Sequence, residues 1–217
     1  MKDLLYKELK LARHPTLFIF PFLGTLLLIP AYPYYVAFAY TCLSIFFVFL
    51  KGNETKDILF TVSLPIRKRD AVKARFWFIA IIELFQILVA VPFAILSIAI
   101  NPNGGGNVVG IEANFAFFGL VFLMYALFNA IYLPMFYRTA YKVGVPLCVA
   151  GAAITLYVVA AEVLVQFVPA LKESLDTTDP SRMLAQLPIL VAGVAVYALS
   201  YWWTYRRSAT LFEKVDL

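Results

Sequence analysis

Six long apolar runs, separated by short polar stretches, constrain the fold of this chain more than any other feature. The runs are 16 to 25 residues long, and the only charged residues inside them are Glu83 and Glu162. An α-helix rises about 1.5 Å per residue, so about 20 apolar residues suffice to cross the hydrocarbon core of a bilayer. The pattern therefore predicts an all-α, polytopic membrane protein with six transmembrane helices, over residues 16–31, 34–50, 76–100, 114–137, 144–168 and 184–205.

The composition leaves little material outside the membrane. Of the 217 residues, 63% are hydrophobic and 14% are charged, whereas soluble domains are about 45–50% apolar and about 25% charged. These values argue against a soluble enzyme, a disordered protein and a small disulfide-stabilised domain. We therefore expect a single transmembrane domain over 1–217, with any ATPase or sensor domain on another chain. Cys42 and Cys148 both lie in apolar runs, so no disulfide framework is expected.

The N-terminal segment, residues 1–15, predicts a short amphipathic helix that lies in the membrane surface. Apolar residues recur along it at helical spacing, and four Lys and Arg residues fill other positions. A solvated tail is the alternative, and His14-Pro15 would turn the chain into the bilayer. The run at 16–31 is short for a span and joins the next run through a Pro-Ala-Tyr-Pro-Tyr hairpin. A re-entrant hairpin therefore stays open beside two full crossings.

The basic residues predict how the chain is oriented. Short cytoplasmic loops are enriched in Lys and Arg, and with six spans 16 of the 18 such residues lie on one side. Four are in the N-terminal segment, seven in 51–75, two in 138–142 and three in the tail, 206–217. Only Lys172 and Arg182 lie on the other side. We therefore expect both termini in the cytoplasm.

The polar loop 51–75 combines apolar residues with acids and a basic run. Residues 54–62 predict a short helix, Ser63-Leu64-Pro65 ends it, and 67–75 restarts as a basic helix leading into the third span. The apolar residues could lie against lipid headgroups, with the cations on the phosphates. An anionic leaflet would repel the acids, however, so a docking element for a groove in a cytoplasmic protein fits better. Its candidate docking residues are Glu54, Asp57, Ile58, Leu59, Phe60, Val62 and Leu64.

These parts resemble the first cytoplasmic loop of ABC-2 type permeases, the membrane subunits of many bacterial ABC exporters. That family commonly has a short acidic and apolar coupling helix, a turn of the SLP or TLP type, and a basic run into the third span. Here the parts are Glu54–Val62, Ser63-Leu64-Pro65 and Arg67–Arg75. The resemblance extends to the amphipathic N-terminal helix, the six spans and the ending Leu211-Phe212-Glu213-Lys214-Val215-Asp216-Leu217. The small six-span form is similar to the permeases of antimicrobial or toxic-peptide exporters.

The resemblance implies a half-transporter in the cell (plasma) membrane of a bacterium. Two permease subunits, the same or related chains, would pair as a dimer, and each would bind an ABC ATPase (nucleotide-binding) subunit through its coupling helix. This chain has no G-x-x-x-x-G-K-[ST] loop, so we expect it to bind no cofactor directly, with ATP and Mg held by the partner ATPase. Only 101–113 and 169–183 reach outside, which argues against a role that needs an extracellular capture domain.

Two acids inside the predicted spans need a physical reason, because a charge at mid-membrane costs about 2.5–3.5 kcal/mol on insertion scales. Glu83 lies in the third span with Gln86 one turn further on, and Glu162 lies in the fifth with Gln166 one turn further on. Their depths put the two acids in opposite leaflets, so a paired-carboxylate site is not expected. These four residues are candidates for a pathway or a subunit seam. Alternatively, each acid is protonated and bonded to a neighbouring helix.

Catalytic and metal-binding patterns are missing from the sequence. Its one histidine is His14, it has no H-E-x-x-H or G-x-S-x-G motif, and no Asp lies in a predicted span. We therefore expect a non-catalytic membrane subunit with no metal site. Its expected partners are proteins and membrane lipids, not nucleic acid.

The leading functional hypothesis is an exporter permease for a hydrophobic or amphipathic cargo. Aromatic-rich and nearly uncharged spans would suit amphipathic peptides or lipid-like compounds better than ions or sugars. The resemblance to the family, in which export of toxic or antimicrobial peptides is a common role, makes a peptide the best candidate. Two other classes stay open. One is a membrane scaffold or assembly protein that binds a cytoplasmic partner through 51–75. The other is a channel or secondary transporter, which would need more polar residues at mid-membrane. Copurification of an ATP-hydrolysing subunit would distinguish the permease from both.

Overall fold

The structure, a computed structural model, describes residues 2–11, 16–100, 107, 109–177 and 179–215. The predicted turn at His14-Pro15, the loop residues 101–106 and the last two residues of the predicted ending lie outside the described residues. Within the described part, all regular structure is helical and no strand is present. The predicted all-α class is therefore confirmed.

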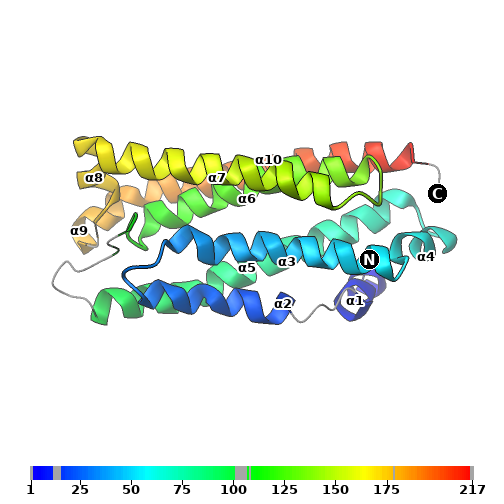
Figure 1. Cartoon of the computed structure of the whole chain (residues 1–217), viewed down its shortest axis with the longest axis horizontal. Coiled ribbons are helices and arrows are strands. Elements are labelled where there is room, and N and C mark those ends of the chain that lie inside the picture. The colour runs from blue at the N-terminus through cyan, green and yellow to red at the C-terminus, as the bar shows by residue number, and fades with distance from the viewer. Residues whose placement is uncertain (1, 12–15, 101–106, 108, 178, 216–217) are drawn as a thin grey trace.

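Five helices are long and apolar enough to cross a membrane. They run side by side along the long axis of an elongated bundle (Figure 1), as expected of a membrane-embedded, multi-pass protein. The helices are α3 (Tyr34–Glu54), α5 (Lys68–Ile100), α6 (Phe115–Tyr137), α7 (Gly144–Phe167) and α10 (Leu187–Glu213), the last preceded by the 3₁₀ turn η2 (Leu184–Gln186).

The first predicted span, at 16–31, is not one of these five helices. It consists of one α-helical turn, α2 (Thr16–Ile19), followed by a 3₁₀ helix, η1 (Phe20–Leu28). A 3₁₀ helix rises about 2.0 Å per residue and an α-helix about 1.5 Å, so the two segments together reach about 24 Å. That is shorter than the roughly 30 Å hydrocarbon core. A sixth crossing stays a prediction, as does the re-entrant alternative.

Close packing against α5 accompanies the unusual geometry of η1. A Cβ placed on Gly24 would lie 3.1 Å from the Cα of Ala90, so the two backbones meet with no side chain between them. Pro21 is buried at the start of η1, and it lacks the N–H that an α-helical hydrogen bond would need. The missing hydrogen bond coincides with the change from α to 3₁₀ geometry.

The two ends of the bundle carry different elements. The short helices α1 (Lys2–Leu11) and α4 (Asp57–Ser63) and the last turns of α10 lie at one end, on the right in Figure 1. The helices α8 (Pro169–Leu175) and α9 (Pro180–Met183) lie at the other end. The basic segments assigned to one side of the membrane thus gather at one end of the molecule.

α6 is the most deeply buried of the long helices. Its aromatic side chains pack against neighbouring helices, as where the ring of Phe136 lies 4.4 Å from that of Phe49. At its crossing with α10, a Cβ on Gly119 would lie 2.7 Å from the carbonyl oxygen of Ile189, and Gly193 lies against the Gly119 carbonyl. Only glycine allows this approach. By contrast, α7 and α10 turn many apolar side chains outward, as lipid-facing helices do.

Candidate functional site

The loop 51–75 folds into a sharp turn, a short helix and a second break. α3 continues through Glu54, one turn further than the predicted span, and the Lys51–Glu54 ion pair (3.1 Å) spans its last turn. Lys56 then has a φ of 53° in the left-handed region, and this turn leads into α4. The short helix therefore begins at Asp57 and not at Glu54 as predicted. It ends at Ser63, because Leu64 is extended ahead of Pro65.

α4 has an outward face and an inward face. Leu59 and Phe60 are 48% and 55% exposed, whereas Ile58 and Val62 pack against the core of the bundle. Of the other predicted docking residues, Glu54 is exposed and Leu64 is half-buried. The predicted docking residues thus divide between a surface that a partner could contact and a surface that fixes the helix in place.

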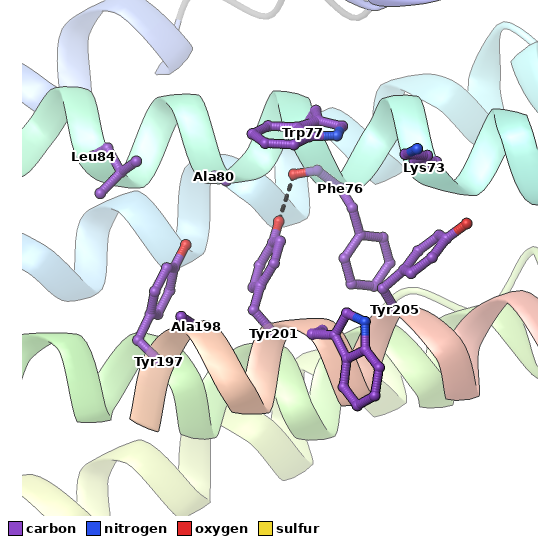
Figure 2. A pocket seen from close by; sticks show the side chains of 10 residues that line it. Lys73, Phe76, Trp77, Ala80, Leu84, Tyr197, Ala198, Tyr201 and Tyr205 are labelled. Carbon is purple, nitrogen blue, oxygen red and sulfur yellow. Dashed lines mark hydrogen bonds between the residues drawn. The ribbon is translucent and has the colours of Figure 1, made fainter. Parts of the chain in front are cut away.

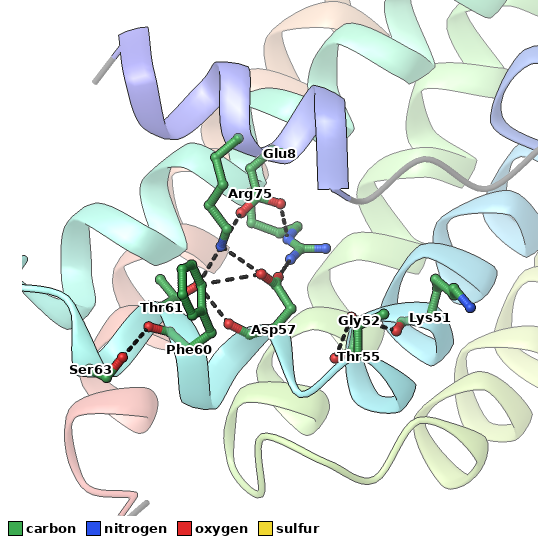
Figure 3. Close-up of polar contacts among 10 residues, drawn as sticks. Glu8, Lys51, Gly52, Thr55, Asp57, Phe60, Thr61, Ser63 and Arg75 are labelled. Carbon is green, nitrogen blue, oxygen red and sulfur yellow. Dashed lines mark hydrogen bonds and ion pairs between the residues drawn. The ribbon is translucent and has the colours of Figure 1, made fainter.

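Asp57, also predicted as a docking residue, points into the protein instead. It is only 8% exposed, and its carboxylate lies 2.7 Å from Nζ of Lys7 and also contacts the Arg75 guanidinium. Figure 3 shows Asp57 between α4 and the helices that carry these cations. Lys7 also contacts the hydroxyl of Thr61, which donates a hydrogen bond to the Asp57 carbonyl.

A second buried acid completes this group. Nε of Arg75 lies 2.6 Å from Oε2 of Glu8, and the guanidinium lies over the Phe49 ring at 5.4 Å. Glu8 and Arg75 are both buried. We call Lys7, Glu8, Asp57 and Arg75 the ionic joint, because these residues connect α1, α4 and the start of α5.

The electrostatics of the ionic joint favour an ionised Asp57. Burial alone would raise the pKa of this carboxyl group. The charges of Arg75 and Lys7, and the hydrogen bonds that they donate, outweigh burial and hold the pKa of Asp57 below its usual range. The charges of two buried acids and two cations therefore balance one another at the point where α1, α4 and α5 meet.

Sequence reasoning missed the ionic joint, although one signal for it was present. Glu8 lies four residues after Leu4 and three after Leu5, so it shares the apolar face of the N-terminal helix. An acid on that face calls for a buried cation. The sequence alone does not say which of the many basic residues of the loop provides it, and the structure assigns that role to Arg75.

Glu83 lies at the centre of a hydrogen-bonded group in the bundle. It is 0% exposed. Its carboxylate accepts hydrogen bonds from Nδ2 of Asn129 on α6 (2.8 and 3.1 Å) and from the hydroxyl of Tyr197 on α10 (2.6 Å). These contacts join three helices of one chain, which fits the bonding to a neighbouring helix in one of the two hypotheses. Protonation of Glu83, and a role in a pathway or a subunit seam, stay predictions.

Gln86 extends this group to a fourth helix. Its Nε2 donates a hydrogen bond to the carbonyl of Ala37 on α3 (2.7 Å), and its Oε1 accepts one from the hydroxyl of Tyr125 on α6. Glu83 and Gln86 therefore lie one turn apart on α5, each held by groups from other helices.

Glu162 and Gln166 lie near the C-terminal end of α7 and connect the segments at the end of the bundle that carries α8 and α9. Glu162 accepts a hydrogen bond from the backbone N–H of Ile111 (3.1 Å), and Gln166 donates one to Asp176 (3.1 Å). The other oxygen of Asp176 accepts a hydrogen bond from the backbone of Glu112 (3.0 Å). The structure therefore does not bring Glu162 to Glu83, since Glu162 contacts Ile111, ahead of α6, and Glu83 contacts Asn129 in the middle of α6.

Cysteine and metal chemistry add no further site. Cys42 and Cys148 both carry free thiols. Across the described ranges, no group of three or more His, Cys, Asp or Glu side chains is placed to hold a metal ion. The ionic joint and the outward face of α4 are thus the main candidate site.

Comparison with known proteins agrees with this description. The model of a family described as "ABC-2 family transporter protein" matches residues 3–207. No curated protein and no solved structure matches the chain significantly.

Proposed function

The chain belongs to the ABC-2 family of transporter proteins, and we propose that it is the permease subunit of an ABC exporter. Membership implies a multi-pass membrane protein, typically a non-catalytic subunit, that associates with an ABC ATPase subunit. The observation that carries the proposal further is the two-faced helix α4, which turns Leu59 and Phe60 outward and is bound to α1 and α5 on its other side.

α4 is the proposed coupling helix. Leu59 and Phe60 would insert into a groove of the ATPase, with Glu54 and Leu64 beside them. Asp57 would not touch the ATPase but would anchor α4 to Arg75 at the start of α5. A displacement of α4 during ATP hydrolysis would then be passed to the membrane part of α5 through the ion pair between Asp57 and Arg75. This pair is buried, so it tolerates little change in its geometry.

α1 is the proposed interfacial helix. It turns Tyr6 outward, and Nζ of Lys10 lies 5.7 Å above the Tyr6 ring. This combination suits the headgroup region, where aromatic and basic residues are favoured. Through Lys7 and Glu8, α1 would hold the coupling helix at a fixed height relative to the membrane surface.

The remaining parts of the proposal follow from the family and the sequence. The chain has six crossings, with α2 and η1 as the first, and both termini lie in the cytoplasm of a bacterial cell. Two permease subunits, identical or related, pair around a path for a hydrophobic or amphipathic cargo. A peptide is the best candidate for this cargo. ATP and Mg are bound by the ATPase and not by this chain.

Docking substitutions on α4 test the proposal. Leu59→Asp and Phe60→Asp should each abolish recovery of the ATPase with the permease in detergent, because each places a charge in an apolar groove. Tyr141→Asp is the matched control, since Tyr141 is an exposed aromatic residue (62% exposed) in the turn between α6 and α7. Membrane insertion and thermal stability should be unchanged in all three variants.

Two outcomes would contradict the proposal at different levels. Normal ATPase recovery with both Leu59→Asp and Phe60→Asp would remove the docking role of α4. Failure to recover any ATP-hydrolysing subunit with the unchanged chain would overturn the permease itself. Recovery of another cytoplasmic protein, lost in the α4 variants, would favour a membrane scaffold.

A further inference from the structure

A groove between α5 and α10 opens on the outside of the bundle. Its volume is about 470 Å³, and it is lined mainly by aromatic side chains. Figure 2 shows Trp77 and Leu84 of α5 on one wall and the tyrosines of α10 on the other. Trp77 is 57% exposed, and Leu84 and Trp202 are about half exposed. The groove therefore faces the surroundings of the bundle, which for two membrane-crossing helices are lipid.

The floor of the groove is held in place by contacts within the chain. The hydroxyl of Tyr201 donates a hydrogen bond to the carbonyl of Phe76, and the Phe76 ring lies 5.2 and 5.6 Å from the rings of Tyr201 and Tyr205. At the deeper end, Tyr197 is bound to Glu83. These contacts fix the two helices at a separation that leaves the groove open, so a ligand would enter a preformed site.

The length of the groove matches one leaflet of a bilayer. It runs along α5 from Lys73 to Leu84, a distance of about 16 Å at 1.5 Å per residue. Half of a hydrocarbon core of roughly 30 Å is about 15 Å. An acyl chain lying in the groove would thus extend from the headgroup level to the middle of the membrane.

Positive charge is confined to one end of the groove. Lys73 lies there and has no ion-pair partner among the residues that the structure describes. Arg206 does not line the groove, but it follows the lining residue Tyr205 on α10, and its guanidinium lies 3.9 Å above the ring of the lining residue Trp202. The opposite end, around Leu84 and Ala198, is apolar. This polarity is that of a phospholipid, with an anionic head and an apolar tail.

We propose that the groove between α5 and α10 binds an anionic phospholipid. Its phosphate lies between Lys73 and Arg206, and one acyl chain follows the aromatic floor toward Leu84. The side of the membrane rests on the orientation in the proposed function, in which this end is cytoplasmic. A second copy of the chain fits less well, since two-fold symmetry would bring the same cations to both sides of the contact.

The tryptophans offer a direct probe of this site. Of the three tryptophans, Trp77 and Trp202 line the groove and Trp203 does not, so a Trp203→Phe background leaves both reporters at the site. The protein is placed in nanodiscs of phosphatidylcholine that contain an equal fraction of brominated phosphatidylglycerol or brominated phosphatidylcholine. We expect stronger quenching by the anionic lipid, with a relative binding constant about fivefold higher per contributing cation.

Matched substitutions distinguish lipid binding in the groove from a general attraction of anionic lipid to the basic surface of the protein. Lys73→Gln should lower the preference for phosphatidylglycerol about fivefold, whereas Lys142→Gln, an exposed lysine at the same end, should not change it. Ala198→Phe fills the groove and should reduce quenching by both lipids. Ala192→Phe, at an exposed position of α10 outside the groove, should not.

Three results would overturn the lipid site. The first is equal quenching by the two headgroups, and the second is an unchanged preference in Lys73→Gln. The third is weak quenching by both lipids together with self-crosslinking of a Trp77→Cys variant in a Cys148→Ser background, which removes the exposed native thiol; this result would indicate a second copy over the groove. The measurement uses neither the ATPase nor a cargo. Its failure is therefore distinguishable from failure of the proposed transport function.

Discussion

The ionic joint and the group around Glu83 both bury acids, but they compensate them differently. In the joint, Glu8 and Asp57 face the cations Arg75 and Lys7. In the middle of the bundle, Glu83 faces only neutral donors, the Asn129 amide and the Tyr197 hydroxyl. The first arrangement is at the end of the bundle, where three short or terminal segments meet, and the second is between long helices.

The difference indicates how well each group of residues tolerates a substitution. Removing one member of a buried ion pair leaves an uncompensated charge, which is expensive. Removing an acid that is held by neutral donors leaves only unsatisfied hydrogen bonds, whose cost is smaller. We therefore expect the ionic joint to be the region less tolerant of substitution, as would suit its proposed role in passing a displacement of α4 to α5.

The largest expected effect is at Arg75. Arg75→Met would leave the buried acids Glu8 and Asp57 with only one cation, Lys7, between them, and we expect the free energy of unfolding to fall by about 3–5 kcal/mol. Titration with a denaturing detergent in mixed micelles measures this value. Arg67→Met is the control, because the Arg67 side chain is 86% exposed in its pair with Asp70 and such pairs contribute about 0–1 kcal/mol. Equal losses in the two variants would remove the distinction between the joint and the surface.

A smaller effect is expected at Glu83. Glu83→Ala would leave the Asn129 and Tyr197 donors without their acceptor, and we expect a loss of about 2 kcal/mol, since hydrogen bonds between membrane helices contribute about 0.6–2 kcal/mol each. Glu83→Gln keeps an acceptor and should recover most of that loss. Leu88→Ala, at an outward-facing position of α5 that does not line the groove, is the control. A loss at Glu83→Ala larger than that at Arg75→Met, in the same titration, would reverse the comparison.

The smallest expected effect is on the stability of the protein at acidic pH. The pKa of Asp57 is lower in the folded chain than the usual value for an aspartate, about 3.9. Its contribution to stability is therefore complete above about pH 4 and is lost as the pH falls through the folded pKa. Thermal melting between pH 7 and pH 3 should show this acid loss. Asp57→Asn should show less of it, because it lacks the ionisable group, whereas Asp70→Asn, at a half-buried position, should retain it. An identical profile for Asp57→Asn would show that Asp57 is not the group responsible.

The breaks in the loop 51–75 could be predicted because their signals are local. Pro65 ends the short helix as expected, and the basic residues that follow it enter a long helix. The sequence did not predict which side chains of this loop point into the protein and which point outward. Glu54 and Asp57 are both acids near the expected start of one short helix, yet they meet different cations. Glu54 pairs with Lys51 three positions earlier on its own helix, whereas Asp57 meets two buried cations, one of them 50 positions earlier in the chain and the other 18 positions later.

The first predicted span, at 16–31, shows that a hydropathy pattern does not determine the type of helix. Hydropathy correctly marks 16–31 as apolar, but it carries no information about helical pitch. The 3₁₀ geometry of η1 accompanies the proline at 21 and the close approach of Gly24 to Ala90, and the partner in that approach lies on α5. A local pattern cannot report a contact with a helix more than sixty residues away.

The sequence by itself determined the class of protein and the distribution of its charge. Apolar runs of this length are stable only as helices in lipid, because every backbone polar group there must be satisfied within the segment. Tertiary structure decided which polar residues are compensated and by what. It paired Arg75 with Glu8 and Asp57, Glu83 with Tyr197, and left Lys73 facing an open groove. The physical reason is that the cost of burying a charge depends on neighbours from other helices, and those neighbours are set by packing.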